Sequence, residues 1–280
     1  MPDALVVSRD TESTLQLETV VRAAGLRVKS CLEIEVAEEW CKLRKFATVI
    51  VDGTISVPEQ QKIAGLLWDQ NPVAPFFSVT HTTESSFGVR DQGERLFGAE
   101  TLRGPGAYED LREQLEVIAR EKDGGKLPPL SIMVVEDLDA PRDIICSYIE
   151  NLGYAVAKDE RSAAGALQHL ESKPGTVSCI ITDIRMPDMN GRQLIEAVRL
   201  HPKLQHLPII VLTAYGTADM LIDCLKAGAS GFLTKPPKKA DLVRELARAQ
   251  RIIHRKKSPR LASSDEADAL REILAERGFY

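Results

Sequence analysis

Acidic, hydroxyl and ammonium side chains follow four short apolar runs in the second half of the chain. Glu136 and Asp137 follow one run, Asp183 follows the next, Thr213 ends the third and Lys235 follows the fourth. Carboxylate oxygens without nitrogen or sulfur ligands suit Mg²⁺ better than zinc. Three carboxylates in one place also require nearby positive charge, which a divalent metal and Lys235 would supply.

The loop after Asp183 favours nucleophilic chemistry at phosphorus. Pro187 restricts this loop to a turn, and Gly191 opens the following helical pattern. A carboxylate held at a rigid strand end beside a metal is suited to attack a phosphoryl group. The metal and Lys235 would draw charge from that group, and Thr213 would donate a hydrogen bond to it.

These residues converge only if the runs are parallel strands of one sheet. Short apolar runs alternate with amphipathic helical patterns, which predicts a parallel sheet covered by helices on both faces. Ligands bind such sheets beyond the carboxyl ends of the strands. The expected strands are 132–135, 154–157, 178–182, 208–213 and 231–234, and the expected helices are 140–151, 161–171, a helix from 191, 217–227 and one beginning near 240.

The first half of the chain repeats this rhythm at a spacing of about 130 residues, which indicates an internal duplication. Its expected strands are 4–7, 26–28, 48–51, 76–79 and 101–103, with helices that include 11–24 and 59–68. We therefore predict an α/β protein with two flavodoxin-like (βα)5 doubly wound domains in tandem and a short C-terminal helical tail. The predicted boundaries are 1–121, a Gly- and Pro-containing linker at 122–130, 131–250 and 251–280.

Composition excludes several classes of protein. A formal charge of −5, from 36 basic and 41 acidic residues, argues against binding nucleic acid through overall charge. No apolar run approaches the roughly 20 residues that span a bilayer, and the N-terminus does not resemble a signal peptide. Five cysteines without a C-x-x-C pair argue against a disulfide framework or a zinc site, and predict a cytoplasmic protein.

Residues 131 to about 250 resemble a receiver domain of the two-component response-regulator family. The resemblance rests on the acidic pair Glu136–Asp137, on Asp183 in D-x-x-M-P-x-x-x-G, on Thr213, and on Lys235 followed by proline. It implies that Asp183 is the phosphoacceptor, and that Thr213 and Lys235 assist it.

The resemblance also implies a cofactor and a switch. Mg²⁺ would bind Asp137, Asp183 and the backbone carbonyl of Arg185, with Glu136 acting through water. Phe232, three residues before the lysine, matches the aromatic switch position of the family. A histidine kinase or histidine phosphotransfer protein would supply the phosphoryl group. The switched surface would then bind a downstream protein target or a second copy, so the expected role is a signalling adaptor rather than a turnover enzyme.

The first half departs from the receiver pattern. Asp52 and Thr80 fall at the acceptor and hydroxyl positions, but Ser8 and Arg9 replace the acidic pair, and Gly104 falls at the lysine position. We expect weak Mg²⁺ binding there and an ion pair between Arg9 and Asp52. This half is expected to be a degenerate receiver that serves as an interaction or dimerisation surface, with Asp52, Thr80 and Arg9 as a vestigial site.

The tail leaves a second function open. Basic residues cluster at 251–260, a capping box is expected at 263–266, and Ala267, Leu270, Ile273 and Leu274 form a short apolar stripe. Such a short helix should dock on the receiver, on a second copy or on a partner. The basic cluster allows a DNA-binding regulator, although no helix-turn-helix is visible and nucleic acid is not the expected partner.

A third class is a haloacid-dehalogenase-type phosphatase. Asp137-Leu138-Asp139 after an apolar strand imitates the D-x-D motif of that family. That family also uses an aspartyl phosphate, a hydroxyl and a lysine. However, Pro141 stands where the motif requires Thr or Val, and this class leaves the sequence from Asp183 to Gly191 unexplained.

Overall fold

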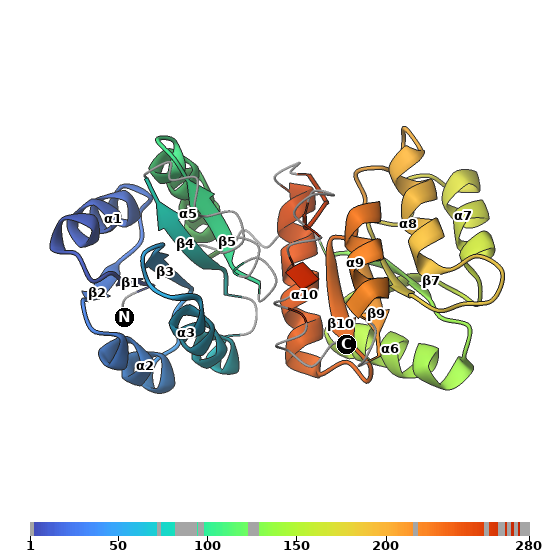
Figure 1. Cartoon of the computed structure of the whole chain (residues 1–280), viewed down its shortest axis with the longest axis horizontal. Helices are drawn as coiled ribbons and strands as arrows, with labels where there is room; N and C mark the ends of the chain where they lie inside the picture. Colours follow the sequence, from blue (N-terminus) through green and yellow to red (C-terminus); the bar gives the residue numbers. More distant parts are fainter. Residues whose placement is uncertain are drawn as a thin grey trace. The chain divides into compact units, whose positions relative to one another are not determined.

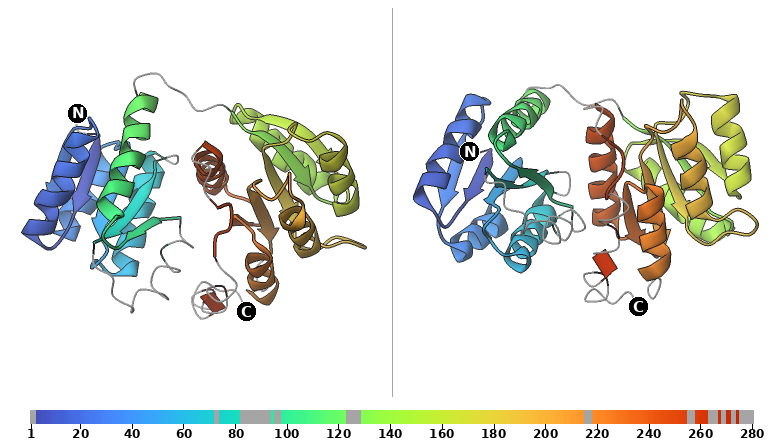
Figure 2. Two further views of the ribbon diagram at one scale, coloured as in Figure 1. Left: turned by 90° about the horizontal axis from the view of Figure 1, so that it is seen from above. Right: turned by 45° about the horizontal axis from the view of Figure 1, so that its top comes forward.

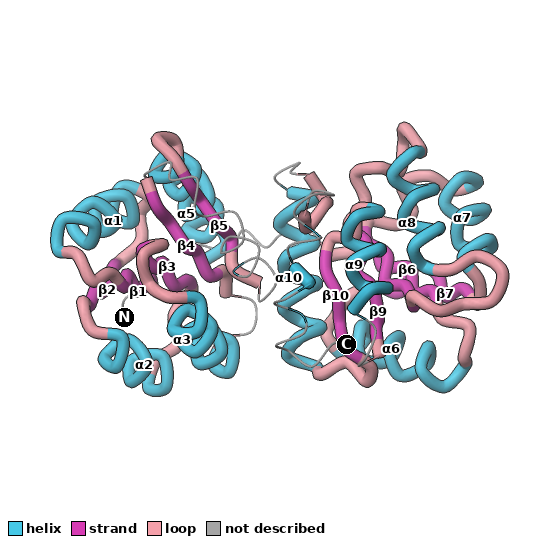
Figure 3. Tube along the Cα trace, viewed as in Figure 1, coloured by secondary structure: helices cyan, strands magenta, loops and turns pink. Residues whose placement is uncertain are grey.

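The computed structural model divides the chain into two compact units, Met1–Leu127 and Pro128–Tyr280. It describes residues 3–71, 74–81, 94, 98–122, 129–214, 218–254, 258–262, 267, 270, 271 and 274. Each unit contains a five-stranded parallel sheet with helices on both faces, as Figures 1 and 3 show. The predicted fold class is therefore confirmed. Within the described part of the chain, no helix is both long enough and apolar enough to cross a membrane.

The first unit has the strand order β2-β1-β3-β4-β5. Odd and even strand positions face opposite sides, and each side packs on its own pair of helices: α2 and α3 on one, α1 and α5 on the other. The elements are β1 (Ala4–Val7), α1 (Thr11–Ala23), β2 (Val28–Cys31), α2 (Ile34–Leu43), β3 (Thr48–Asp52), α3 (Val57–Gln70), β4 (Phe76–Thr80), β5 (Glu100–Arg103) and α5 (Ala107–Lys122).

The second unit has the equivalent order β10-β9-β8-β6-β7. Its inner strands are almost wholly apolar, as expected where helices cover both faces of a sheet. The elements are β6 (Ser131–Val135), α6 (Asp139–Asn151), β7 (Ala155–Glu160), α7 (Ala163–Ser172), β8 (Cys179–Asp183), α8 (Gly191–Leu200), β9 (Ile209–Thr213), α9 (Ala218–Ala227), β10 (Gly231–Thr234) and α10 (Lys239–His254).

Two strand predictions were wrong in their boundaries, and both concern edge strands. The second strand of the first unit was expected at 26–28, but it runs from Val28 to Cys31. The second strand of the other unit was expected at 154–157, but it continues to Glu160. Both strands pair on one side only and are partly exposed, so their polar residues do not show the apolar run that identifies an inner strand. α2 was not singled out from the sequence either.

The described residues after α10 return to the connection between α9 and β10. The amide of Leu261 donates a hydrogen bond of 2.8 Å to the carbonyl of Ala229. Further along, Ala267, Leu270 and Leu274 are buried, and Arg271 pairs with Asp219 on α9. The tail therefore docks on the second unit. Figure 2 shows the sheet and helices of this unit in two further views. The capping box at 263–266 and Ile273 lie outside the described residues.

Replacing Leu270 with Asp should release the tail, because a charge cannot be buried at this apolar contact without a partner. Limited proteolysis should cut the chain after α10 several-fold faster in Leu270→Asp than in the wild type. Arg271→Ala is the control, because an exposed ion pair contributes only about 0–1 kcal/mol. Equal cleavage rates for Leu270→Asp and the wild type would show that the tail is not held by its apolar residues.

Candidate functional site

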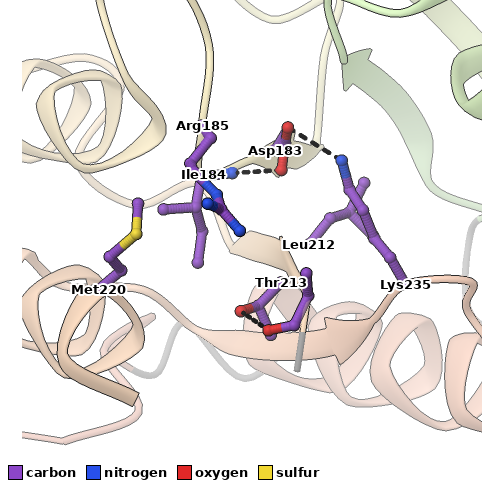
Figure 4. A pocket seen from close by; sticks show the side chains of 8 residues that line it. Asp183, Ile184, Arg185, Leu212, Thr213, Met220 and Lys235 are labelled. Atoms are coloured by element: carbon purple, nitrogen blue, oxygen red, sulfur yellow. Dashed lines mark hydrogen bonds and ion pairs between the residues drawn. The ribbon is translucent and has the colours of Figure 1, made fainter. Parts of the chain in front are cut away.

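The candidate site lies at the carboxyl ends of β6, β8, β9 and β10 (Figure 4). β6 and β8 are neighbours in the sheet, with Val135 opposite Thr182, so the residues that follow them meet at one rim. The strand order reverses at this pair, which is the position where parallel sheets of this kind bind ligands.

Three carboxylates gather there. Oxygens of Glu136, Asp137 and Asp183 lie within 4.8 Å of one another, and no other such group is found among the described residues. Glu136 and Asp183 are buried, whereas Asp137 is half-buried. At this spacing the charges repel one another strongly, so the group needs positive charge to remain ionised.

Lys235 supplies part of that charge. Its Nζ lies 2.7 Å from Glu136 Oε2 and 2.9 Å from Asp183 Oδ2, and therefore bridges the two buried carboxylates. Burial raises the pKa of the Glu136 carboxyl, the neighbouring Asp183 and Asp137 raise it further, and Lys235 opposes this shift. Lys235 follows β10, whose last residue Thr234 pairs in register with Thr213 of β9.

The carboxylates fit a hard divalent cation. Glu136 Oε1 is fully buried and has no hydrogen-bond partner in the described structure, although such an atom normally has one. Together with two other carboxylates, this oxygen is the type of ligand that Mg²⁺ prefers. Glu136, Asp137 and Asp183 are thus the residues that could hold the ion. Arg185, expected to add its carbonyl, directly follows Ile184 in the same loop and has an exposed side chain.

Asp183 is held rigidly at the end of β8. Its Oδ1 accepts a hydrogen bond of 2.8 Å from the amide of Ile184. The pocket in front of it is lined by Asp183, Ile184, Arg185, Leu212, Thr213, Ala214, Met220 and Lys235. The hydroxyl of Thr213 donates to the carbonyl of Ala214 at 3.2 Å, and Phe232 lies half-buried opposite Val211. The predicted acceptor, hydroxyl and lysine thus surround one pocket.

The first unit places Asp52 and Thr80 at the equivalent strand ends, but its surroundings differ. Asp52 Oδ1 accepts a hydrogen bond from the amide of Thr54, and Oδ2 lies 3.4 Å from the hydroxyl of Ser8. The expected Arg9–Asp52 ion pair was wrong, because Arg9 binds Glu59 at 2.6 Å instead. Glu59 belongs to the capping box of α3, which holds its carboxylate where Arg9 reaches it from outside the site.

A half-buried arginine near this rim was missed in the sequence. Arg103, the last residue of β5, donates to the carbonyl of Ser78 at 2.6 Å and pairs with the buried Glu94 at 2.5 Å. A Cβ on Gly53 would lie 1.9 Å from Thr80 Oγ1, so only glycine permits this close approach of Thr80. The sequence signal that could have indicated this contact was the position of Arg103 immediately before Gly104, the residue at the lysine position.

Comparison with known proteins identifies the second unit. Residues 132–247 match the family model described as the response regulator receiver domain. The chain is 34% identical over 107 residues to the chemotaxis protein CheY of Pseudomonas aeruginosa, in an alignment that covers 38% of this chain and 85% of that protein. It is 33% identical over 125 residues to the two-component response regulator ORR11 of Oryza sativa subsp. indica, covering 45% and 83%.

Among solved structures, the signal receiver domain of a signal transduction histidine kinase from Syntrophus aciditrophicus is similar, with 28% identity and a TM-score of 0.41. This similarity covers 46% of the present chain and 96% of that chain. From the family match and the curated relatives, the chain belongs to the response regulator receiver family, a family of two-component signalling proteins.

Gly191 allows a prediction about the rigidity of the acceptor loop. A Cβ at this first residue of α8 would lie 2.2 Å from the carbonyl oxygen of Asp183. Gly191→Ala should therefore displace the Asp183 backbone, at a cost of about 1–3 kcal/mol in the free energy of unfolding. Gly65→Ala is the control, because Gly65 lies in α3 with open space around it, and the variant should gain about 0.5–1 kcal/mol. Denaturant titration measures both, and similar values for the two variants would contradict the close approach.

Mg²⁺ should stabilise the second unit alone. Both tryptophans, Trp40 and Trp68, lie in the first unit, so their fluorescence reports the unfolding of that unit only. We expect Mg²⁺ to raise the calorimetric unfolding temperature of the other transition while the fluorescence transition stays in place. Asp137→Asn should abolish most of this shift, and Asp52→Asn should retain it.

The Mg²⁺ effect should also depend on pH. The pKa of Glu136 is raised in the folded state, so the folded protein holds a proton that the unfolded chain has already lost. Metal-free protein should therefore lose stability as the pH rises from the ordinary glutamate range through this raised pKa. Stabilisation by Mg²⁺ should increase over the same window, because the metal binds the carboxylate. A shift that is independent of pH would argue against Glu136 as part of the metal site.

Proposed function

We propose that this protein is a response regulator of a two-component phosphorelay and that Asp183 is its phosphoacceptor. The donor is the phosphohistidine of a histidine kinase or a histidine phosphotransfer protein. The observation that carries the proposal is the bridge from Lys235 to Glu136 and Asp183 beside a third carboxylate, at the carboxyl ends of adjacent parallel strands. Five free cysteines suit a reducing compartment, so we assign the protein to the cytoplasm.

The transfer uses the groups of the pocket in defined roles. A carboxylate oxygen of Asp183 attacks phosphorus, the new O–P bond forms as the N–P bond of phosphohistidine breaks, and the imidazole leaves with a proton from solvent. Lys235 attracts the negative charge of the phosphoryl oxygens, and the hydroxyl of Thr213 donates a hydrogen bond to one of them. Asp137, Asp183 and the carbonyl of Arg185, together with Glu136, would hold Mg²⁺, and the ion would supply further positive charge.

The switch begins at Thr213. Turning its hydroxyl from the carbonyl of Ala214 toward a phosphoryl group empties space that the half-buried ring of Phe232 on the next strand can occupy. This changes the surface formed by α9 and β10, which then binds a downstream protein or a second copy. Output by contact, as an adaptor, is the role that we assign.

In this proposal the first unit is a degenerate receiver that does not accept a phosphoryl group. Ser8 and Arg9 replace the acidic pair, and Arg9 is engaged with Glu59 at 2.6 Å. Arg103, paired with the buried Glu94, lies next to Gly104, which stands at the position of the missing lysine. The unit then serves as an interaction surface, and it retains the receiver fold without accepting a phosphoryl group.

The phosphatase alternative lacks support from the geometry. A D-x-D motif needs both carboxylates at one metal, but Asp139 pairs with Arg142 and with Arg161 and is not part of the carboxylate cluster. DNA binding through the basic stretch has no observation in its favour, since 255–257 lie outside the described residues.

Acetyl phosphate with Mg²⁺ tests the acceptor directly. Intact-mass measurement should show one added phosphoryl group, lost in Asp183→Asn and retained in Asp52→Asn. Peptide mapping should place the group at Asp183, and EDTA should prevent its addition because the transfer needs the charge of the metal. Labelling that persists in Asp183→Asn, or that disappears in Asp52→Asn, would refute the assignment.

A further inference from the structure

A buried guanidinium lies behind the acidic pair. Arg142 of α6 is 4% exposed, and its Nη1 donates a hydrogen bond of 3.0 Å to the backbone carbonyl of Glu136. Nη2 pairs with the carboxylate of Asp139, and Nε lies 3.3 Å from Asp159 Oδ2 at the end of β7. The planar guanidinium of Arg142 therefore connects Glu136 after β6, Asp139 at the start of α6 and Asp159 of the edge strand β7.

These contacts restrain Glu136, which also binds the residues that end β7 and follow β10. The amide of Glu136 donates to the carbonyl of Glu160 at 3.1 Å, and its Oε2 accepts from Lys235 at 2.7 Å. Arg142 holds the remaining backbone group, the carbonyl. Because the peptide unit is planar, the direction of this carbonyl also sets the position of the amide and Cα of Asp137.

We propose that Arg142 is a positioning residue that orients the Glu136–Asp137 peptide so that the Asp137 carboxylate meets those of Glu136 and Asp183. The proposal rests on the function proposed above, in which these carboxylates hold Mg²⁺. Arg142 touches neither the metal nor the phosphoryl group in this role. It acts only through the backbone carbonyl of Glu136.

Electrostatics and positioning predict opposite results for this residue. If only the charge of Arg142 mattered, its removal would tighten Mg²⁺ binding, because a nearby cation repels the metal. If Arg142 positions Asp137, its removal weakens binding, and loss of such a supporting partner typically costs about 10–100-fold in metal affinity. The sign of the change therefore separates the two roles.

The test is calorimetric titration of the full metal-free chain with Mg²⁺. Arg142→Met should raise the dissociation constant at least about 10-fold. Arg161→Ala is the matched control, because Arg161 pairs with the same Asp139 at 3.0 Å but is exposed, and its dissociation constant should stay within about twofold of the wild type. In acetyl phosphate labelling, Arg142→Met should need about 10-fold more Mg²⁺ for half-maximal rate yet approach the wild-type rate at saturation.

Unchanged or tighter Mg²⁺ binding by folded Arg142→Met would overturn the proposal. If that variant does not fold, Arg142→Lys replaces it, since one ammonium cannot serve the Glu136 carbonyl and both carboxylates together. Its dissociation constant should rise about threefold, and wild-type affinity would overturn the proposal. If the wild-type chain is not labelled at Asp183 in the presence of Mg²⁺, the proposed function itself is rejected. If the wild type is labelled normally and the Arg142 variants bind Mg²⁺ with wild-type affinity, only the role of Arg142 is rejected.

Discussion

The repulsion among three carboxylates at one sheet edge is the constraint on which the second unit depends. Glu136 and Asp183 are buried, and the pKa of Glu136 is raised by that burial and by its acidic neighbours. Lys235 offsets the repulsion through its contacts with both, so β10, which it follows, must end at the same edge of the sheet as β6 and β8. The unpartnered Glu136 Oε1 shows that one lysine does not satisfy the group. The site is therefore prepared for further positive charge, which is the property that metal-assisted phosphoryl transfer requires.

The parallel sheet supplies the geometry for this site. Each inner strand is buried on both faces, and a slip by one residue would move every side chain to the opposite helical layer, so the positions of the strand ends are well defined. The loop after β8 is equally restrained, because Gly191 approaches the Asp183 carbonyl closely and donates to the carbonyl of Ile184 at 2.9 Å. In the proposed switch, Thr213 and Phe232 would therefore move relative to a rigidly held Asp183.

The two units share one fold but have different residues at the carboxyl ends of their strands. Asp52 and Asp183 end equivalent strands, and Thr80 and Thr213 end the strands beside them. In the first unit, the half-buried Arg103 pairs with the fully buried Glu94 near the rim. Loss of Arg103 would leave the buried Glu94 carboxylate without this partner, and an uncompensated buried charge typically costs about 3–5 kcal/mol, which gives the first unit a structural reason to keep Arg103. The α/β scaffold is preserved because its apolar strands do not depend on the acidic pair.

The sequence by itself determined the duplicated α/β fold and the convergence of Glu136, Asp183 and Lys235, because apolar runs identify inner strands and the carboxyl ends of parallel strands share one edge. It missed the extent of the edge strands β2 and β7, whose polar residues carry no such pattern. Only the tertiary structure decided the partners of the charged side chains. Arg9 pairs with Glu59 rather than Asp52, and Arg142 donates to the Glu136 carbonyl. Long side chains bind the opposite charge or carbonyl that lies within reach, and the packing of elements distant in sequence decides which group that is.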